Sequence, residues 1–278
     1  MLDLSIAQAV IEGETILARS ANFNDDWQAS AISMCKGFGP LPPGASCPAA
    51  IFARPLGRKW VAITQVGGPP AFTSLRFRFL VLSRTLYDLL NDPFAIADRF
   101  PPNWDARGVL PDLEWPSQPL PRRTMAQLDA ILKQGDGPFL LGASQALVDG
   151  GKILLQRETP DPGLLRDLWL LLPDSTRRDV WPATFAYSND LGFDLIALPA
   201  VPENGVPGYL SEDQARDYPE SRYERNLQEA IESGDQRTLD RLLSRRSSTE
   251  TLRLALFIIA VGVGTVIVGR LLVALGVI

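Results

Sequence analysis

The last 25 residues of the chain restrict its fold more than any other feature, because nearly all of them are apolar. Residues 254–269 carry no charge, Arg270 follows, and eight further apolar residues end at Ile278. A helix of this length would measure about 37 Å, enough to cross a hydrocarbon core of about 30 Å. The sequence therefore predicts one C-terminal transmembrane helix over residues 252–278. The alternative is a buried core helix of a soluble protein.

Small residues recur every fourth position within this predicted span. Ala260 and Gly264 form one such pair, and Thr265 and Gly269 form another. Small residues at this spacing let two membrane helices approach closely, so the pattern is compatible with a homo-oligomer, although Gly and Ala are common in membrane helices in general. Arg270 either extends its side chain to the headgroups or pairs with an acidic residue of a partner.

The charges that flank the apolar stretch indicate its orientation. Four arginines lie just before it or at its start, and no charge follows Arg270: Arg241, Arg245, Arg246 and Arg253. By the positive-inside rule, the large N-terminal part then lies in the cytoplasm. We expect no secretory signal at the N-terminus, which has acidic residues and no basic n-region. These features predict a tail-anchored, single-pass protein of the inner (cytoplasmic) membrane, in contact with the membrane lipid bilayer.

Composition excludes several kinds of chemistry. The chain contains no histidine, so Ser-His-Asp triads, Cys-His pairs and histidine-ligated metals are excluded. In a reducing cytoplasm Cys35 and Cys47 are expected to be free thiols, and a disulfide becomes plausible only if the topology is different. The formal net charge of −5 and the lack of a basic cluster argue against nucleic-acid binding. We expect no cofactor and no metal.

Periodicity and turn residues predict a mixed fold ahead of the apolar stretch. Residues 4–19, divided at Gly13, predict a hairpin or a strand with a tight turn, and residues 50–56, 59–67 and 75–83 predict strands. Within the third strand, Arg76 and Arg78 alternate with apolar residues and are expected on a solvent-facing side. Helices and strands alternate over residues 124–200, which is typical of α/β organisation.

The expected fold class is an α+β (mixed α/β) cytoplasmic domain followed by a short helical pair and one C-terminal transmembrane helix. Residues 1–200 form the domain, with room for two subdomains at 1–100 and 123–200. Residues 201–218 read as a polar linker, because Pro, Gly and charged residues dominate them. Two amphipathic helices are expected over residues 219–246.

Ser33 and Lys36 are the leading candidates for catalysis. They match the S-x-x-K pattern in which a lysine activates a serine without histidine. No K-T-G motif follows, such a tetrapeptide often arises by chance, and helix packing is its simpler explanation. Ser144 lies in an incomplete nucleophile elbow, and Lys152 follows two glycines without the rest of a phosphate loop. Arg177 and Arg178 could hold an anionic group or simply be surface charges.

Several segments together resemble a known family: ILARSANFNDDW, GPLPPG, RFRFLVLS followed by DPF, LLRDLWLLLPDSTRRDVWPATFAYS, and FDLIALP. Over about residues 8–200 the chain resembles the N-terminal domain of GTPase-associated proteins from bacterial conflict systems. The resemblance implies a non-catalytic regulatory or interaction domain that works beside a GTPase in trans. It supplies no catalytic residues.

We therefore expect a non-catalytic cytoplasmic domain that is held at the membrane and binds an unidentified protein partner. The resemblance implies that this partner is a GTPase acting in trans. One alternative is a membrane-tethered serine hydrolase that uses Ser33 and Lys36. Another is an oligomerising membrane effector that acts through its C-terminal helix.

Overall fold

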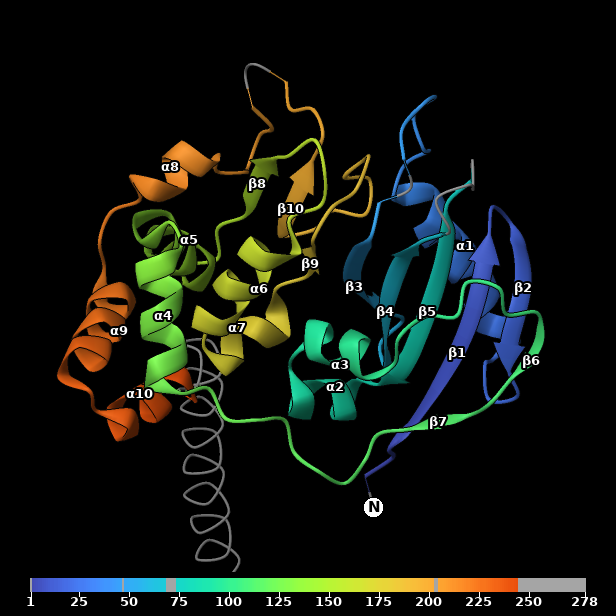
Figure 1. Ribbon diagram of the computed structural model, residues 1–278, viewed down its shortest axis with the longest axis horizontal. Coiled ribbons are helices and arrows are strands. Elements are labelled where there is room, and N and C mark those ends of the chain that lie inside the picture. Colours follow the sequence, from blue (N-terminus) through green and yellow to red (C-terminus); the bar gives the residue numbers. More distant parts are fainter. Residues whose placement is uncertain (1, 47, 69–73, 203–204, 245–278) are drawn as a thin grey trace, which may run out of the picture.

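The structure, a computed structural model, describes residues 2–46, 48–68, 74–202 and 205–244. Within these residues, ten strands form one sheet that helices cover on both sides (Figure 1). The strand order is β6-β2-β1-β5-β4-β3-β9-β10-β8, and β7 pairs with β1. The described residues thus form a mixed α/β fold.

The strands are β1 (Ser5–Glu12), β2 (Thr15–Ser20), β3 (Ala50–Leu56), β4 (Trp60–Gly67), β5 (Arg76–Ser83), β6 (Gly108–Leu110), β7 (Leu113–Glu114), β8 (Ile153–Gln156), β9 (Pro182–Ala183) and β10 (Leu195–Leu198). The helices are α1 (Gln28–Gly37), α2 (Arg84–Leu90), α3 (Pro93–Arg99), α4 (Met125–Gln134), α5 (Gly137–Val148), α6 (Pro162–Leu171), α7 (Asp174–Asp179), α8 (Glu212–Arg216), α9 (Arg222–Ser233) and α10 (Gln236–Leu243). A short 3-10 helix (Asp25–Trp27) precedes α1.

Strands β1 to β5 form an antiparallel unit, and the predicted hairpin at its start is confirmed. β1 and β2 turn at Gly13, which has a φ of 59° that suits glycine. In β5 every residue except Ser83 is buried, because α1 packs on one face of the unit and α2 and α3 on the other. A strand buried on both faces reads as a nearly continuous apolar run, as β4 does over residues 60–63 and β5 over residues 79–82.

The expectation that Arg76 and Arg78 face solvent is wrong. Both are buried, with 3% and 6% of their surface exposed. The extended segment 100–115 crosses this end of the sheet, and its carbonyl oxygens accept hydrogen bonds from both guanidiniums, from Arg76 at Trp104 and from Arg78 at Phe100. Burial lowers the pKa of Arg78 to about 10. Strand alternation placed these side chains on one face correctly, but could not show that a distant segment covers that face.

The other end of the sheet is parallel, as the alternation over residues 124–200 predicted. β10 pairs in parallel with both β8 and β9. Helices α6 and α7 lie in the connection from β8 to β9, and α4, α5, α9 and α10 gather beyond them (Figure 1). α5 is buried along almost its whole length, so it is the central helix of this half.

Residues 205–218 contain α8, a short helix that begins with a capping box between Ser211 and Gln214. α8 packs directly on α5: a Cβ added at Gly142 would lie 2.0 Å from the carbonyl oxygen of Ala215. The two amphipathic helices that follow are confirmed as α9 and α10. They turn at Gly234 and bury Leu227 and Leu239 against the domain.

The predicted fold class must be corrected where it includes a transmembrane helix. In the part of the chain that the structure describes, no helix is long and apolar enough to cross a membrane. The longest, α5 and α9, have 12 residues each, which is about 18 Å of helix against about 30 Å of hydrocarbon. The tail-anchored, single-pass description therefore has no support in the described helices.

The stretch on which the membrane prediction depended, residues 252–278, lies outside the described residues. The helix-packing positions predicted within it lie outside them as well: Ala260, Gly264, Thr265, Gly269 and Arg270.

Replacing Gly142 by alanine tests the contact between α5 and α8. Alanine normally stabilises a helix interior relative to glycine by about 0.5–1 kcal/mol. Here the added methyl collides with the Ala215 carbonyl, so we expect Gly142→Ala to lower the free energy of unfolding by about 1–3 kcal/mol in urea titrations. Gly163→Ala in α6 is the control, since its Cβ would meet nothing closer than 3.6 Å. Equal effects of the two substitutions would contradict the contact.

Candidate functional site

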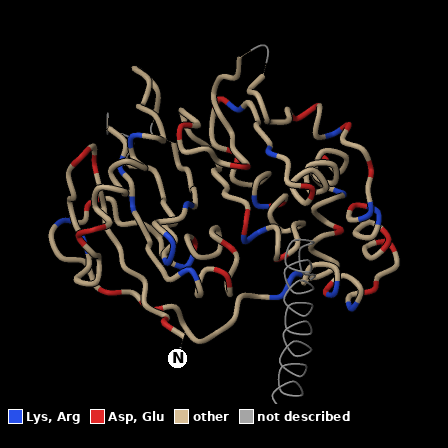
Figure 2. Tube along the Cα trace, turned by 180° about the vertical axis from the view of Figure 1, so that it is seen from behind, with Lys and Arg blue, Asp and Glu red and all other residues tan. Residues whose placement is uncertain are grey.

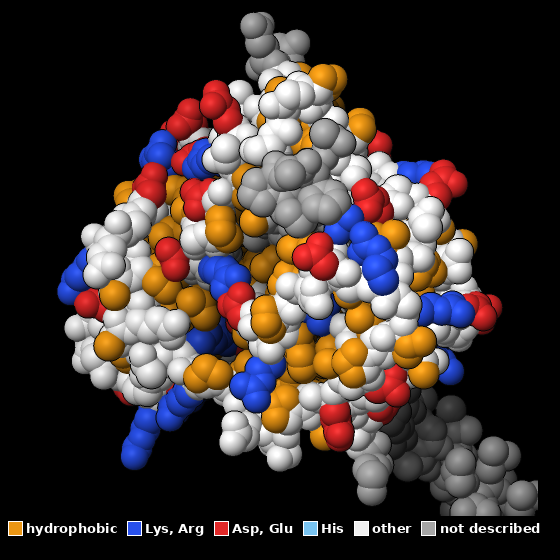
Figure 3. Space-filling model, turned by 45° about the vertical axis from the view of Figure 1, so that its right-hand side comes forward, with side chains coloured by type: hydrophobic (Ala, Val, Ile, Leu, Met, Phe, Trp, Pro, Cys, Tyr) orange, Lys and Arg blue, Asp and Glu red, His pale blue; other side chains and the backbone are white. Residues whose placement is uncertain are grey.

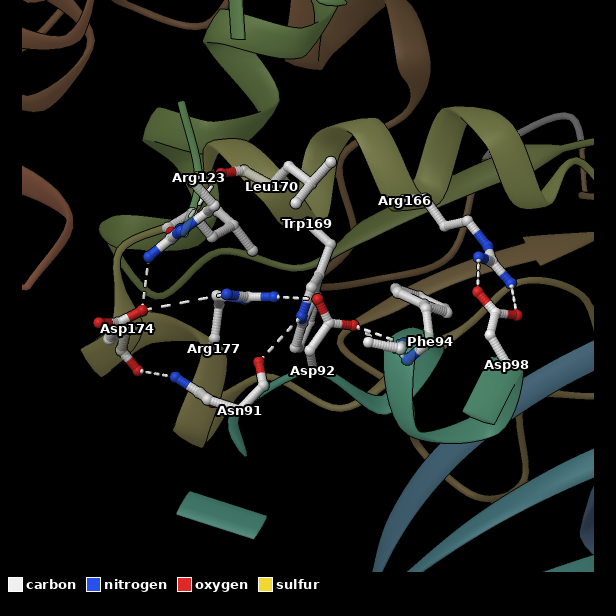
Figure 4. Close-up of polar contacts among 12 residues, drawn as sticks. Asn91, Asp92, Phe94, Asp98, Arg123, Arg166, Trp169, Leu170, Asp174 and Arg177 are labelled. Atoms are coloured by element: carbon white, nitrogen blue, oxygen red, sulfur yellow. Dashed lines mark hydrogen bonds and ion pairs between the residues drawn. The ribbon is translucent and has the colours of Figure 1, made fainter. Parts of the chain in front are cut away.

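A cavity of about 420 Å³ lies where the two halves of the chain meet: the antiparallel half, which includes α2 and α3, and the half that holds α4, α6, α7 and α10. Its wall includes the start of α3, the segment that leads into α4, the α6–α7 corner and the end of α10. Six charged side chains line it: Asp92, Arg122, Arg123, Asp174, Arg177 and Asp240. Figure 4 shows the inner members of this set, which we call the arginine cluster: Asp92, Arg123, Asp174 and Arg177.

The deepest contact of the arginine cluster is the ion pair between Arg177 of α7 and Asp92. Arg177 Nη2 lies 2.7 Å from Asp92 Oδ2, and the two side chains are only 6% and 15% exposed. Asp92 Oδ1 also caps α3, because it accepts hydrogen bonds from the amides of Phe94 and Ala95. The Arg177 guanidinium lies 5.4 Å from the ring centroid of Trp169. One carboxylate thus starts a helix and neutralises a buried arginine.

Arg123 lies next to this ion pair and caps the C-terminal end of α6. Its Nη1 donates to the carbonyl oxygens of Leu170 and Leu172, which have no partner within the helix. Its Nη2 lies 2.5 Å from Asp174 Oδ1, and Arg177 Nη1 lies 3.9 Å from the same oxygen. Burial, and to a smaller extent the positive charge of Arg177, lower the pKa of Arg123 to about 10, although Asp174 opposes the shift.

Asn91 links α2 to the arginine cluster. It ends α2 in the left-handed conformation, with a φ of 54°, which asparagine tolerates better than most residues. Its Nδ2 donates to the backbone oxygen of Asp174 at 2.6 Å, and its backbone carbonyl oxygen accepts from Trp169 Nε1 at 3.2 Å. The turn after α2 is therefore held against both α6 and α7.

The outer wall of the cavity is α10. Arg122 Nε donates to Asp240 Oδ1 at 2.9 Å, and the two side chains are 63% and 33% exposed. Gln236 Nε2 donates to the carbonyl of Arg123 at 3.1 Å, while its Oε1 accepts from the amide of Met125 at 2.8 Å. Polar contacts thus hold the last described helix to the start of α4.

Elsewhere the charges are mixed in sign. Lys and Arg are interspersed with Asp and Glu along the trace in Figure 2. On the face drawn in Figure 3, both signs are scattered among hydrophobic side chains. The cavity also holds both signs in equal number, but it brings three arginines and three aspartates together in one concave surface.

The structure does not bring Ser33 and Lys36 into this site. Both are exposed on α1, and neither lines the cavity. Lys36 Nζ instead lies 2.6 Å from Glu14 Oε1, and this contact lowers the pKa of Glu14. The partner that the structure gives to Lys36 is thus a carboxylate of the β1–β2 turn and not the hydroxyl of Ser33.

The minor candidates have structural roles. Ser144 is buried in α5 and donates to the carbonyl of Leu141. Lys152 pairs with Asp194 at 3.0 Å where β8 begins. Cys35 is a buried free thiol whose pKa is raised by burial, and Cys47 lies outside the described residues. Among the residues described, no group of three or more Cys, Asp or Glu is placed to hold a metal ion.

Sequence reasoning reached one member of the arginine cluster as a candidate for anion binding, Arg177. It missed Arg123. The available signal was the Arg122-Arg123 pair directly before the capped helix α4, but paired arginines are common on surfaces. Their burial depends on α6 and α10, which lie far away in the sequence.

Scans of the chain against protein-family models, curated proteins and solved structures found no match. The resemblance to GTPase-associated proteins therefore stays a prediction.

The arginine cluster predicts a large difference between two arginines that both bind α3. Arg177→Leu leaves the buried Asp92 without its partner, so we expect a loss of about 3–5 kcal/mol in the free energy of unfolding. Arg166→Leu is the control, because its pair with Asp98 is 33% and 55% exposed and should contribute about 0–1 kcal/mol. Urea unfolding of both variants measures the difference, and a similar loss in both would show that burial of the Arg177 pair is unimportant.

Proposed function

We propose that this chain is a non-catalytic regulatory or interaction domain that recognises its partner at the cavity beneath α10. The observation that carries the proposal is the gathering of Arg122, Arg123 and Arg177 in one concave surface at the meeting point of both halves. Arginine presents planar sets of donors that suit recognition of partner groups rather than bond breaking. The resemblance over residues 8–200 supports a GTPase acting in trans as the first partner to test.

Neither alternative function is favoured by a described contact. The hydrolase requires Ser33 and Lys36 to act together, yet Lys36 binds Glu14. The oligomerising effector depends on residues outside those described.

A tryptophan that fills the cavity tests the proposal. Gln127 is exposed on α4 and lines the cavity, whereas Gln134 is exposed at the end of the same helix and does not. We expect Gln127→Trp to abolish capture of the partner by the immobilised full chain, because the indole occupies the site, and Gln134→Trp to leave capture unchanged. The measurement is quantitative proteomics on material from the source cells, repeated with any purified GTPase that is captured.

Two outcomes would overturn the proposal. Identical sets of captured proteins for the wild type and both variants would show that the cavity is not the recognition site. Covalent labelling of Ser33 by a fluorophosphonate, abolished in Ser33→Ala, would show that the chain is an enzyme.

A further inference from the structure

The mouth of the cavity combines an exposed ion pair with a buried arginine. Arg122 and Arg123 both line the cavity, but the first is 63% exposed and the second 12%. Arg122 is paired with Asp240 of α10, whose side chain is 33% exposed. An ion pair this exposed contributes little to stability, because water screens it and both side chains lose freedom in forming it. The Arg122–Asp240 contact can therefore exchange for another one at small cost.

The carboxylates inside the cavity, Asp92 and Asp174, already have hydrogen-bond or ion-pair partners. Asp92 accepts two amide hydrogen bonds of α3 as well as the bond from Arg177. Asp174 Oδ1 is shared between Arg123 and Arg177, at 2.5 and 3.9 Å. Arg177 Nε is buried and has no hydrogen-bond partner among the described residues. Burial is the first cause of the lowered pKa of Arg123 and the charge of Arg177 the second, so the two guanidiniums repel each other across Asp174.

We propose that the cavity binds an oxyanion, the phosphate or carboxylate group of a ligand, between Arg122 and Arg123, and that the oxyanion replaces Asp240 as the partner of Arg122. The inference rests on the proposed function for the location of the site and adds the chemistry of what is bound. Two guanidiniums on one oxyanion give charge-assisted hydrogen bonds that are stronger than neutral ones.

The size of the cavity indicates that the oxyanion is part of a larger ligand. A volume of about 420 Å³ lies within the range of roughly 300–1,000 Å³ for small-molecule sites. Leu90, Ala95 and Leu170 contribute apolar surface next to the arginines. The body of the ligand would pack against these side chains, with its anionic group at the mouth.

Competition between the ligand and Asp240 predicts opposite effects of two substitutions. Asp240→Asn removes the competing charge while keeping the shape of the side chain, so binding of inorganic phosphate should tighten about 3- to 10-fold. Arg122→Gln removes one of the two guanidiniums, so binding should weaken about 10-fold or more. Arg58→Gln, in the exposed turn between β3 and β4, should leave binding unchanged.

The experiment is isothermal titration of the full chain with inorganic phosphate, and separately with acetate, at low ionic strength. Thermal unfolding of each variant confirms that it is folded. The ratio of the two affinities tells whether the site prefers phosphate or carboxylate. Weaker or unchanged binding in Asp240→Asn would overturn the competition, and unchanged binding in Arg122→Gln would overturn the site.

The two proposals can fail separately. If no anion binds but Gln127→Trp still abolishes capture of the partner, the oxyanion inference is wrong and the interaction site stands. If anions bind with the expected pattern but capture does not depend on the cavity, the site is an anion site and the interaction function is wrong.

Discussion

The ion pair between Arg177 and Asp92 sets how α3, α6 and α7 lie around the cavity. A charge this far from water must have a partner, because losing one partner leaves the other buried and uncompensated. Asp92 cannot move without also uncapping α3, and Arg177 cannot move without leaving the face of Trp169. The pair thus fixes α3 against α6 and α7, and the cavity is the space that remains between these helices and α10.

At two other places, arginine side chains donate hydrogen bonds to backbone carbonyl oxygens that no helix or strand pairs. Arg123, with the hydroxyl of Tyr223, accounts for three carbonyl oxygens at the end of α6. Arg76 and Arg78 do the same for the irregular segment that crosses the sheet. Unpaired buried carbonyls are costly, and a long side chain with five donors can reach several of them from one position. Burying these arginines therefore follows from the irregular backbone around them.

Local signals were sufficient for most helices and strands, but not for the site. Thr124 and Asp92-Pro93 begin their helices with signals that a sequence shows directly, because a cap depends on residues within one turn. Arg78 binds Gln8, 70 positions away, and no local pattern encodes that contact. The apolar C-terminal run was interpreted from hydropathy alone, and the described helices, none longer than 12 residues, do not support a membrane-spanning fold. Arg177 was noticed but its burial was not, since α3 supplies its partner.

The graded exposure of the ion pairs explains why one surface can be both rigid and able to bind. Arg177 is 6% exposed, Arg123 12% and Arg122 63%, so the cost of losing a partner falls from the floor of the cavity to its mouth. The inner pairs keep the shape of the cavity because breaking them leaves buried charge. The outer pair exchanges readily, because water and an incoming anion can each replace Asp240. A ligand bound as we propose would therefore gain the charge of Arg122 without disturbing the inner ion pairs.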